Sequence, residues 1–113
     1  MELAPLSPRL ARLPRRRVHG REVPVAVGPR ARLLGLALLP RERVGSGLLI
    51  PRCASVHTFG MRFSLDLVFL DAEGRVLERR RAVPPGRIFA CRRARAVLEI
   101  PAPPGGEIAP PSP

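Results

Sequence analysis

One stretch in the middle of the chain restricts the possible folds more than any other part of the sequence. Between residues 63 and 70, apolar side chains recur at every second position and then occupy consecutive positions. The pattern is typical of a strand that has one solvent-exposed face at its start and is buried on both faces towards its end. The residues on one face are Phe63, Leu65, Leu67 and Phe69, and those that make the other face apolar are Val68 and Leu70. The sequence therefore predicts a β-strand that runs into a core.

The residues after this strand predict a tight turn and a returning strand. In Asp71-Ala72-Glu73-Gly74, the aspartate can accept hydrogen bonds from the backbone ahead of it, and the glycine can adopt a positive φ without a Cβ clash. Residues 75–78 then read Arg-Val-Leu-Glu, which suits a partner strand. A β-hairpin is therefore the predicted centre of the fold.

Short strands are predicted on either side of this hairpin. Apolar runs bounded by glycine, proline or arginine indicate strands at residues 23–27, 48–50, 56–59, 87–91 and 94–100. The 113 residues are enough for one domain with a modest core. We therefore predict a mainly β (α+β) fold, a small open β-barrel or sandwich with one helix covering one end.

That helix is predicted to begin at Pro29, because proline suits the first helical position, and to end near Pro40. Its buried face would carry Leu33, Leu34, Ala37 and Leu38. Gly35 lies inside this segment, where glycine weakens a helix. We interpret it as a sign that another part of the chain approaches the backbone closely.

Composition divides the chain into three predicted segments. Residues 1–17 form a flexible basic arm, residues 18–101 the single β-rich domain, and residues 102–113 a Pro/Gly-rich disordered tail. No apolar run is long enough to span a bilayer or to resemble a signal peptide. Two cysteines without an export signal favour reduced thiols in a soluble cytoplasmic protein that does not contact a membrane.

The net charge of +11 biases encounters toward polyanions such as nucleic acid. If two arginine runs lay at one end of the sheet, they would form a polyanion-binding patch. The candidates are Arg79, Arg80, Arg81, Arg92, Arg93 and Arg95. With no Tyr or Trp to stack on bases, sequence-specific recognition is not supported. Weak contact with phosphates and a merely solvated surface remain alternative interpretations.

Four residues near the start of the central strand are candidates for ligand binding: His57, Met61, Arg62 and Asp66. A histidine and a carboxylate could perform acid–base chemistry, but no second carboxylate or nucleophile accompanies them. Alternatively, His57 bonds to the backbone and Met61 packs in the core. Asp66 lies between two leucines and needs donors. It therefore forms an ion pair, with Arg62 as one candidate partner, or anchors a ligand.

No metal or cofactor is expected. Cys53, His57 and Cys91 could supply three zinc ligands, but the fourth ligand and a Cys-x-x-Cys pair are missing. A redox pair would need the two cysteine Cα atoms within about 7 Å, so two half-buried free thiols are the expectation. The common glycine-rich nucleotide-binding loops and hydrolase motifs are absent from the sequence.

The segment His57-Thr58-Phe59-Gly60-Met61-Arg62-Phe63 and the strand after it resemble the domain of unknown function 192 family. Three further pieces fit in order: Arg-Leu-Leu-Gly-Leu at 32–36, Gly-Leu-Leu-Ile at 47–50 and Val-Leu-Glu-Ile-Pro at 97–101. The resemblance covers about residues 23–101, and the chain departs from the family pattern after them. It implies a small, mainly β domain without an assigned chemistry.

The leading hypothesis is a non-catalytic accessory module that binds a small ligand or a protein near His57, Met61, Arg62 and Asp66. The second is a weak nucleic-acid or polyanion binder that uses the arginine runs. The third is an enzyme that uses His57 and Asp66.

Overall fold

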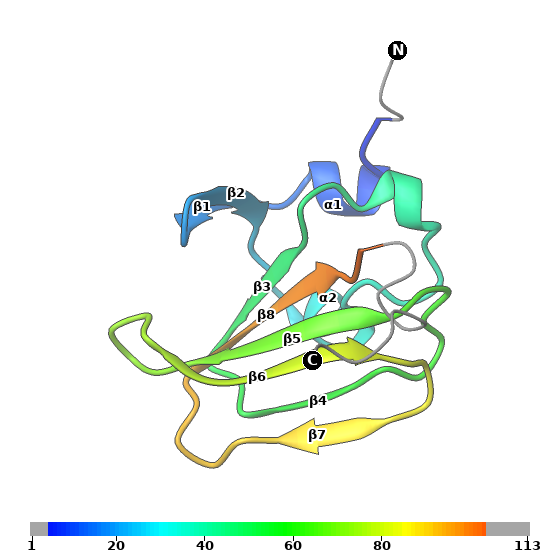
Figure 1. Cartoon of the computed structure of the whole chain (residues 1–113). Coiled ribbons are helices and arrows are strands. Elements are labelled where there is room, and N and C mark those ends of the chain that lie inside the picture. The colour runs from blue at the N-terminus through cyan, green and yellow to red at the C-terminus, as the bar shows by residue number, and fades with distance from the viewer. Residues whose placement is uncertain (1–4, 104–113) are drawn as a thin grey trace.

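The computed structural model describes residues 5–103, and most of its regular structure is β (Figure 1). The elements in chain order are α1 (Pro8–Ala11), β1 (Arg15–Val18), β2 (Arg21–Pro24), α2 (Pro29–Leu34), a 3-10 helix η1 (Arg41–Arg43), β3 (Leu48–Pro51), β4 (Ser55–His57), β5 (Leu65–Leu70), β6 (Val76–Val83), β7 (Ile88–Ala90) and β8 (Ala96–Pro101). The predicted mainly β fold is confirmed, and the sheets are open.

The central sheet has four antiparallel strands in the order β3-β8-β5-β6. Its β5–β6 pair is the predicted hairpin. Asp71 Oδ1 accepts the backbone N–H groups of Glu73 and Arg75 at 2.9 and 2.8 Å, and Gly74 has a φ of 84°. The local turn chemistry was therefore enough to predict this hairpin. Strand β6 continues to Val83, further than its apolar pattern indicates.

Each face of this sheet carries an apolar cluster. One lies under α1, α2 and the two-stranded β4–β7 ribbon, and its members include Leu10, Leu36, Ile50, Val56, Leu67 and Phe69. The other lies against the β1–β2 hairpin and contains Val23, Val25, Leu49, Val68, Leu70 and Leu98. Side chains alternate between faces along each strand. The sheet is therefore apolar on both sides, as predicted for β5.

The N-terminal segment differs from the flexible arm predicted for residues 1–17. The part that the structure describes contains α1 and β1, and Leu10 is only 1% exposed within the core. Ser7 caps α1 by accepting the backbone N–H of Arg9 at 3.3 Å. Burial of Leu10 explains why this arginine-rich segment is ordered.

The predicted C-terminal tail lies mostly outside the described residues, which end at 103. Ala102, its first residue, is fully buried. Its N–H donates to the Ser64 carbonyl at 2.9 Å. The packed domain therefore extends one residue past the predicted boundary.

Helix α2 begins at Pro29 as predicted but ends at Leu34, because Gly35 breaks it with φ 53° and ψ −125°. The predicted buried face is therefore only partly correct. Leu33 and Leu38 are 68% and 62% exposed, whereas Ala37 is buried. The close approach predicted at Gly35 is confirmed, since a Cβ there would lie 2.7 Å from Oε1 of Glu99.

Candidate functional site

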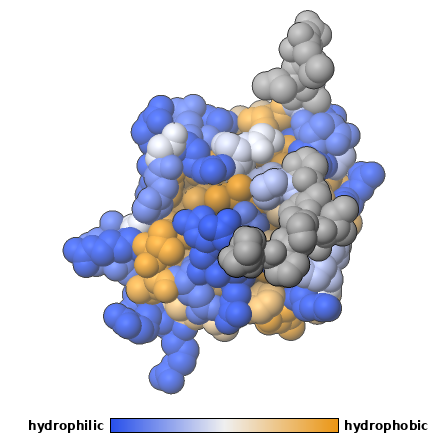
Figure 2. Space-filling model, viewed as in Figure 1, coloured by the Kyte–Doolittle hydropathy of each residue, from blue (hydrophilic) through white to orange (hydrophobic). Residues whose placement is uncertain are grey.

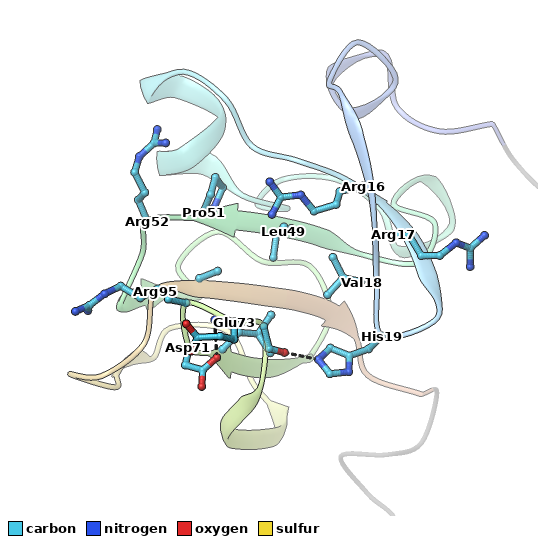
Figure 3. Close-up of a pocket in the computed structure, with 14 residues that line it drawn as sticks. Arg16, Arg17, Val18, His19, Leu49, Pro51, Arg52, Asp71, Glu73 and Arg95 are labelled. Carbon is cyan, nitrogen blue, oxygen red and sulfur yellow. Dashed lines mark hydrogen bonds between the residues drawn. The ribbon is translucent and has the colours of Figure 1, made fainter.

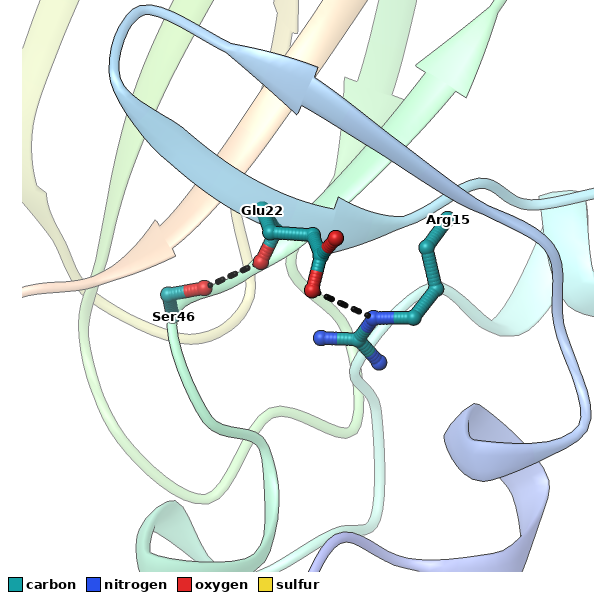
Figure 4. A network of polar contacts seen from close by, with 3 residues as sticks. All are labelled: Arg15, Glu22 and Ser46. Carbon is teal, nitrogen blue, oxygen red and sulfur yellow. Dashed lines mark hydrogen bonds and ion pairs between the residues drawn. The ribbon is translucent and has the colours of Figure 1, made fainter.

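The β1–β2 hairpin is attached to the rest of the domain at both ends. At one end Arg15 Nε lies 3.4 Å from Glu22 Oε1, and Ser46 Oγ donates to the Glu22 carbonyl at 2.9 Å (Figure 4). Arg21 Nη1 also donates to the Ser46 carbonyl at 3.1 Å. The two bonds with Ser46 connect the hairpin to the segment just before β3, and the Arg15–Glu22 pair joins its two strands.

At its other end the hairpin reaches the β5–β6 turn. His19 adopts a positive φ of 47°, and its Nε2 lies 2.7 Å from the carbonyl oxygen of Gly74. Because a carbonyl can only accept, Nε2 carries the proton. This bond joins two turns that are far apart in the sequence.

A cavity of about 720 Å³ lies between the hairpin and the β5–β6 turn (Figure 3). We call it the hairpin cavity. Its apolar lining comes from Val18, Leu49, Leu70 and Ala96, and its charged lining from Arg16, Arg17, Arg52, Arg95, Asp71 and Glu73. It therefore combines an apolar floor with a rim that has more cations than anions.

The arginines of the hairpin cavity differ in direction. Figure 3 shows that Arg16 extends over β3, whereas the side chains of Arg17, Arg52 and Arg95 point outward from the rim, with Arg52 and Arg95 at the end opposite His19. The ion pairs found among residues 5–103 are Arg15–Glu22 and Arg80–Glu78, so the rim arginines are not neutralised by a carboxylate there. Asp71 is already held by two backbone N–H groups. The rim can therefore attract an anion.

A second, smaller cavity of about 140 Å³ contains a buried carboxyl group, that of Glu99. We call it the Glu99 cavity. Glu99 lies in the middle of β8, between Leu48 of β3 and Leu67 of β5, and is only 3% exposed. Desolvation raises the pKa of its carboxyl from 4.5 to about 7, and a hydrogen bond from the Leu36 backbone opposes that rise. Oε1 has no hydrogen-bond partner in the described part of the chain.

The turn after α2 makes room for this carboxyl. A Cβ at Gly35 would collide with Oε1, so glycine is needed there for steric as well as conformational reasons. Arg9 Nη2 donates to the carbonyls of Gly35 and Ala37 at 2.9 and 2.7 Å. The N-terminal segment therefore helps to fix the backbone that faces Glu99.

Of the predicted site residues, His57 lines the Glu99 cavity. Its Nδ1 accepts the Phe59 N–H at 3.2 Å, so its Nε2 carries the proton and donates to the Leu33 carbonyl at 3.2 Å. Met61 is buried in the core cluster. Both residues thus have the structural roles that the sequence left open as alternatives.

Asp66 is held by the backbone and forms no ion pair with Arg62 or with another arginine among residues 5–103. Its Oδ1 accepts the N–H of Ala82 at 2.8 Å, where Ala82 has a φ of 52° and the β5–β6 pairing is irregular. The residue stabilises a bulge, and Arg62 is exposed.

The arginine run on β6 does not point to one side. Arg79 lines a small cavity with Val68 and Leu98. Arg80 lies 5.1 Å from the Phe89 ring centroid and forms a 2.5 Å ion pair with Glu78. Neighbouring strand residues face opposite sides of a sheet. Among the remaining candidates, Arg95 lines the hairpin cavity, whereas Arg81, Arg92 and Arg93 are exposed outside it.

Cys53 and Cys91 are free and half-buried, as predicted. Across residues 5–103, no group of three or more His, Cys, Asp or Glu side chains is arranged to hold a metal ion. No helix in the same range is long and apolar enough to cross a bilayer. On the face shown in Figure 2, hydrophilic residues predominate and apolar patches lie between them.

Sequence reasoning missed Glu99 and Arg52 as site residues. A signal for Glu99 was present, because an acidic residue sits between Leu98 and Ile100 in an apolar strand that must be buried. Nothing in the sequence marks Arg52, since its position depends on how β3 and β8 pair.

Comparisons with known proteins place the chain in a family. A model of the DUF192 family, described as an uncharacterised ACR, matches residues 12–105. A crystal structure of a protein of unknown function from Novosphingobium aromaticivorans is 21% identical with a TM-score of 0.58, covering 73% of this chain and 64% of that one. A candidate transcription regulator from Sinorhizobium meliloti is 22% identical with a TM-score of 0.59, covering 78% of each chain.

The chain thus spans less than two thirds of the Novosphingobium protein. At these identities the two structures show a shared fold. No curated protein matches the chain. The family model covers most of the sequence, and the predicted resemblance is confirmed: the chain belongs to the DUF192 family, which has no assigned activity.

Proposed function

We propose that the protein is a non-catalytic binding module that holds a small anionic ligand with an apolar part in the hairpin cavity. The observation that carries this proposal is the position of Arg16, Arg52 and Arg95 around the apolar floor. The location differs from the region near His57 and Asp66, where the sequence placed the ligand.

Size and chemistry support such a ligand. The volume of about 720 Å³ falls within the range of about 300–1,000 Å³ typical of small-molecule sites. Leu49, Leu70 and Ala96 can remove a hydrocarbon surface from water. Guanidinium groups bind carboxylate or phosphate through paired hydrogen bonds. An organic phosphate or carboxylate meets both requirements.

The lining favours binding over catalysis. It contains no serine, threonine, cysteine or lysine, which are the commonest nucleophiles. Its histidine, His19, holds the Gly74 carbonyl. Asp71 holds two backbone N–H groups. His19 and Asp71 are therefore engaged in maintaining the cavity, and the remaining carboxylate of the lining, that of Glu73, has no nucleophile beside it.

Isothermal titration calorimetry at constant ionic strength tests the proposal. Phenyl phosphate should bind more tightly than inorganic phosphate or phenol, because it alone engages both the arginines and the apolar floor. Arg52→Ala should weaken phenyl phosphate binding about tenfold, the usual effect of losing a charged hydrogen bond. The exposed Arg87→Ala, which removes the same charge elsewhere, should leave the affinity within about twofold. Equal weakening by both variants would indicate attraction by net charge alone and refute the site.

We also propose a cytoplasmic location. The two free cysteines suit a reducing compartment. Thiol labelling in intact cells with membrane-permeant and membrane-impermeant reagents tests it. Labelling by the impermeant reagent would contradict it.

A further inference from the structure

The position of Glu99 is unusual for a carboxyl group. It lies in the centre of the four-stranded sheet, 3% exposed, on the face that carries the main apolar cluster. Burying a carboxyl group there is unfavourable unless both oxygens find hydrogen-bond partners. Its carboxyl receives the backbone N–H of Leu36, and Oε1 has no partner within residues 5–103. An apolar residue at position 99 would pack in this cluster equally well.

The Oε1 atom is next to a cavity that the fold keeps open. Gly35 contributes no side chain to it, and a Cβ there would lie 2.7 Å from Oε1. Ser55 and Leu33 also line the cavity and are exposed, Leu33 by 68%, so the cavity communicates with solvent. At about 30 Å³ per water molecule in the liquid, 140 Å³ accommodates about four water-sized groups.

The charged and polar neighbours do not satisfy Glu99. Both terminal nitrogens of Arg32 donate to backbone carbonyls, those of Pro51 and Arg52. His57 donates to the Leu33 carbonyl. The backbone thus takes two of the five N–H groups of Arg32 and the Nε2–H of His57. Neither side chain bonds to Oε1 of Glu99, and this oxygen remains available to a ligand.

We propose that the Glu99 cavity is a binding site for a compact N–H donor group with a short apolar body, such as a primary amide or a small ammonium. Its N–H would donate to Glu99 Oε1, and its hydrocarbon part would lie against Leu34, Ile50 and Val56. This site lies on the opposite face of the sheet from the hairpin cavity, and the proposal does not depend on the anion proposed there.

Carbon-13 NMR of protein labelled at the glutamate carboxyl carbons tests the proposal on the wild-type chain. Acetamide and acetone form one matched pair, and methylammonium and tetramethylammonium chloride form another at constant ionic strength. The N–H-bearing member of at least one pair should shift the Glu99 Cδ resonance saturably, and the pair that responds identifies a neutral or a charged donor. The proposal is overturned if neither N–H probe shifts the resonance, or if acetone and tetramethylammonium shift it equally.

A variant pair provides a second test. Glu99→Gln keeps the side-chain shape but replaces one acceptor oxygen by a donor, so affinity for the responding probe should fall at least about tenfold. The control is Glu42→Gln, which removes an exposed carboxylate elsewhere and should change nothing. Unchanged affinity in Glu99→Gln would overturn the proposal. Phenyl phosphate binding should be the same in both variants, which separates failure here from failure of the hairpin cavity.

Discussion

The hairpin cavity and the Glu99 cavity place charge in opposite ways on the two faces of one sheet. In the first, exposed arginines surround an apolar floor. In the second, one buried carboxyl lies in a small cavity lined by both apolar and polar side chains. Exposed charges contribute little to stability and are free to attract ligands, whereas a buried charge lowers stability unless it is partnered. Substitutions in the two cavities should therefore affect different quantities.

The largest expected effect concerns Glu99 and pH. Its pKa rises from 4.5 to about 7 on folding, so the unfolded chain releases this proton first as pH increases. The free energy of unfolding therefore falls as the pH rises from 4.5 to about 7. The loss is about 3 kcal/mol in total, at about 1.4 kcal/mol per pH unit. Glu99→Gln has no such loss. Relative to wild type, it should gain about 3 kcal/mol of stability between pH 4.5 and pH 8, measured by urea denaturation.

A pH-independent difference between Glu99→Gln and wild type would show that the carboxyl titrates normally in the folded chain. Glu42→Gln, at an exposed position, should follow wild type at every pH.

The next largest effect is expected at Gly35. Gly35→Ala combines an unfavourable positive φ with a Cβ that lies 2.7 Å from Glu99 Oε1, and should destabilise the protein by about 2–3 kcal/mol. Gly20→Ala is the control, because Gly20 has a positive φ but open space around its Cβ. Thermal denaturation should show the smaller loss in Gly20→Ala. Equal losses would mean that the carboxyl moves aside without cost.

A smaller effect is expected at His19, which joins the hairpin to the β5–β6 turn. His19→Phe keeps a ring but loses the Nε2–H donor to Gly74, and should reduce the free energy of unfolding by about 1 kcal/mol. His19→Gln retains an N–H donor and should recover part of the loss. Faster amide hydrogen exchange at residues 15–24 in His19→Phe would accompany the change. Unaltered exchange would contradict a role for His19 in holding the hairpin.

The smallest effect on stability is expected at the rim of the hairpin cavity. Arg52→Ala should change the free energy of unfolding by less than about 0.5 kcal/mol, because its guanidinium is exposed. The same substitution should weaken phenyl phosphate binding about tenfold. A large loss of stability would instead identify Arg52 as a structural residue. It would also contradict the expectation that the rim arginines affect binding whereas Glu99 affects stability.

Much of the fold was predictable because it depends on local chemistry. The β5–β6 hairpin follows from alternation along β5 and from the hydrogen bonds of Asp71 within its own turn. The start of α2 follows from Pro29. The end of α2 was predicted too far along the chain, because we placed Gly35 inside the helix, whereas Gly35 terminates the helix. Leu33 and Leu38 are exposed as a result.

The two cavities were not predictable, because each depends on contacts between distant segments. The hairpin cavity requires His19 to reach Gly74, and the Glu99 cavity requires β8 to lie between β3 and β5 so that Glu99 faces Gly35. The partner of Asp66 was predicted wrongly for a similar reason. An acid in an apolar strand suggested an arginine partner, but the irregular pairing of β5 with β6 supplies the backbone N–H of Ala82 instead.

The most direct test of the proposed anion site is an amide NMR titration of the wild-type protein with phenyl phosphate at physiological ionic strength. The proposal predicts saturable shifts confined to the hairpin cavity, at residues 16–19, 49, 52, 70–74, 95 and 96, with the Glu99 region unchanged. Shifts spread over the exposed arginines at 81, 92 and 93, or no saturable shift at all, would contradict it.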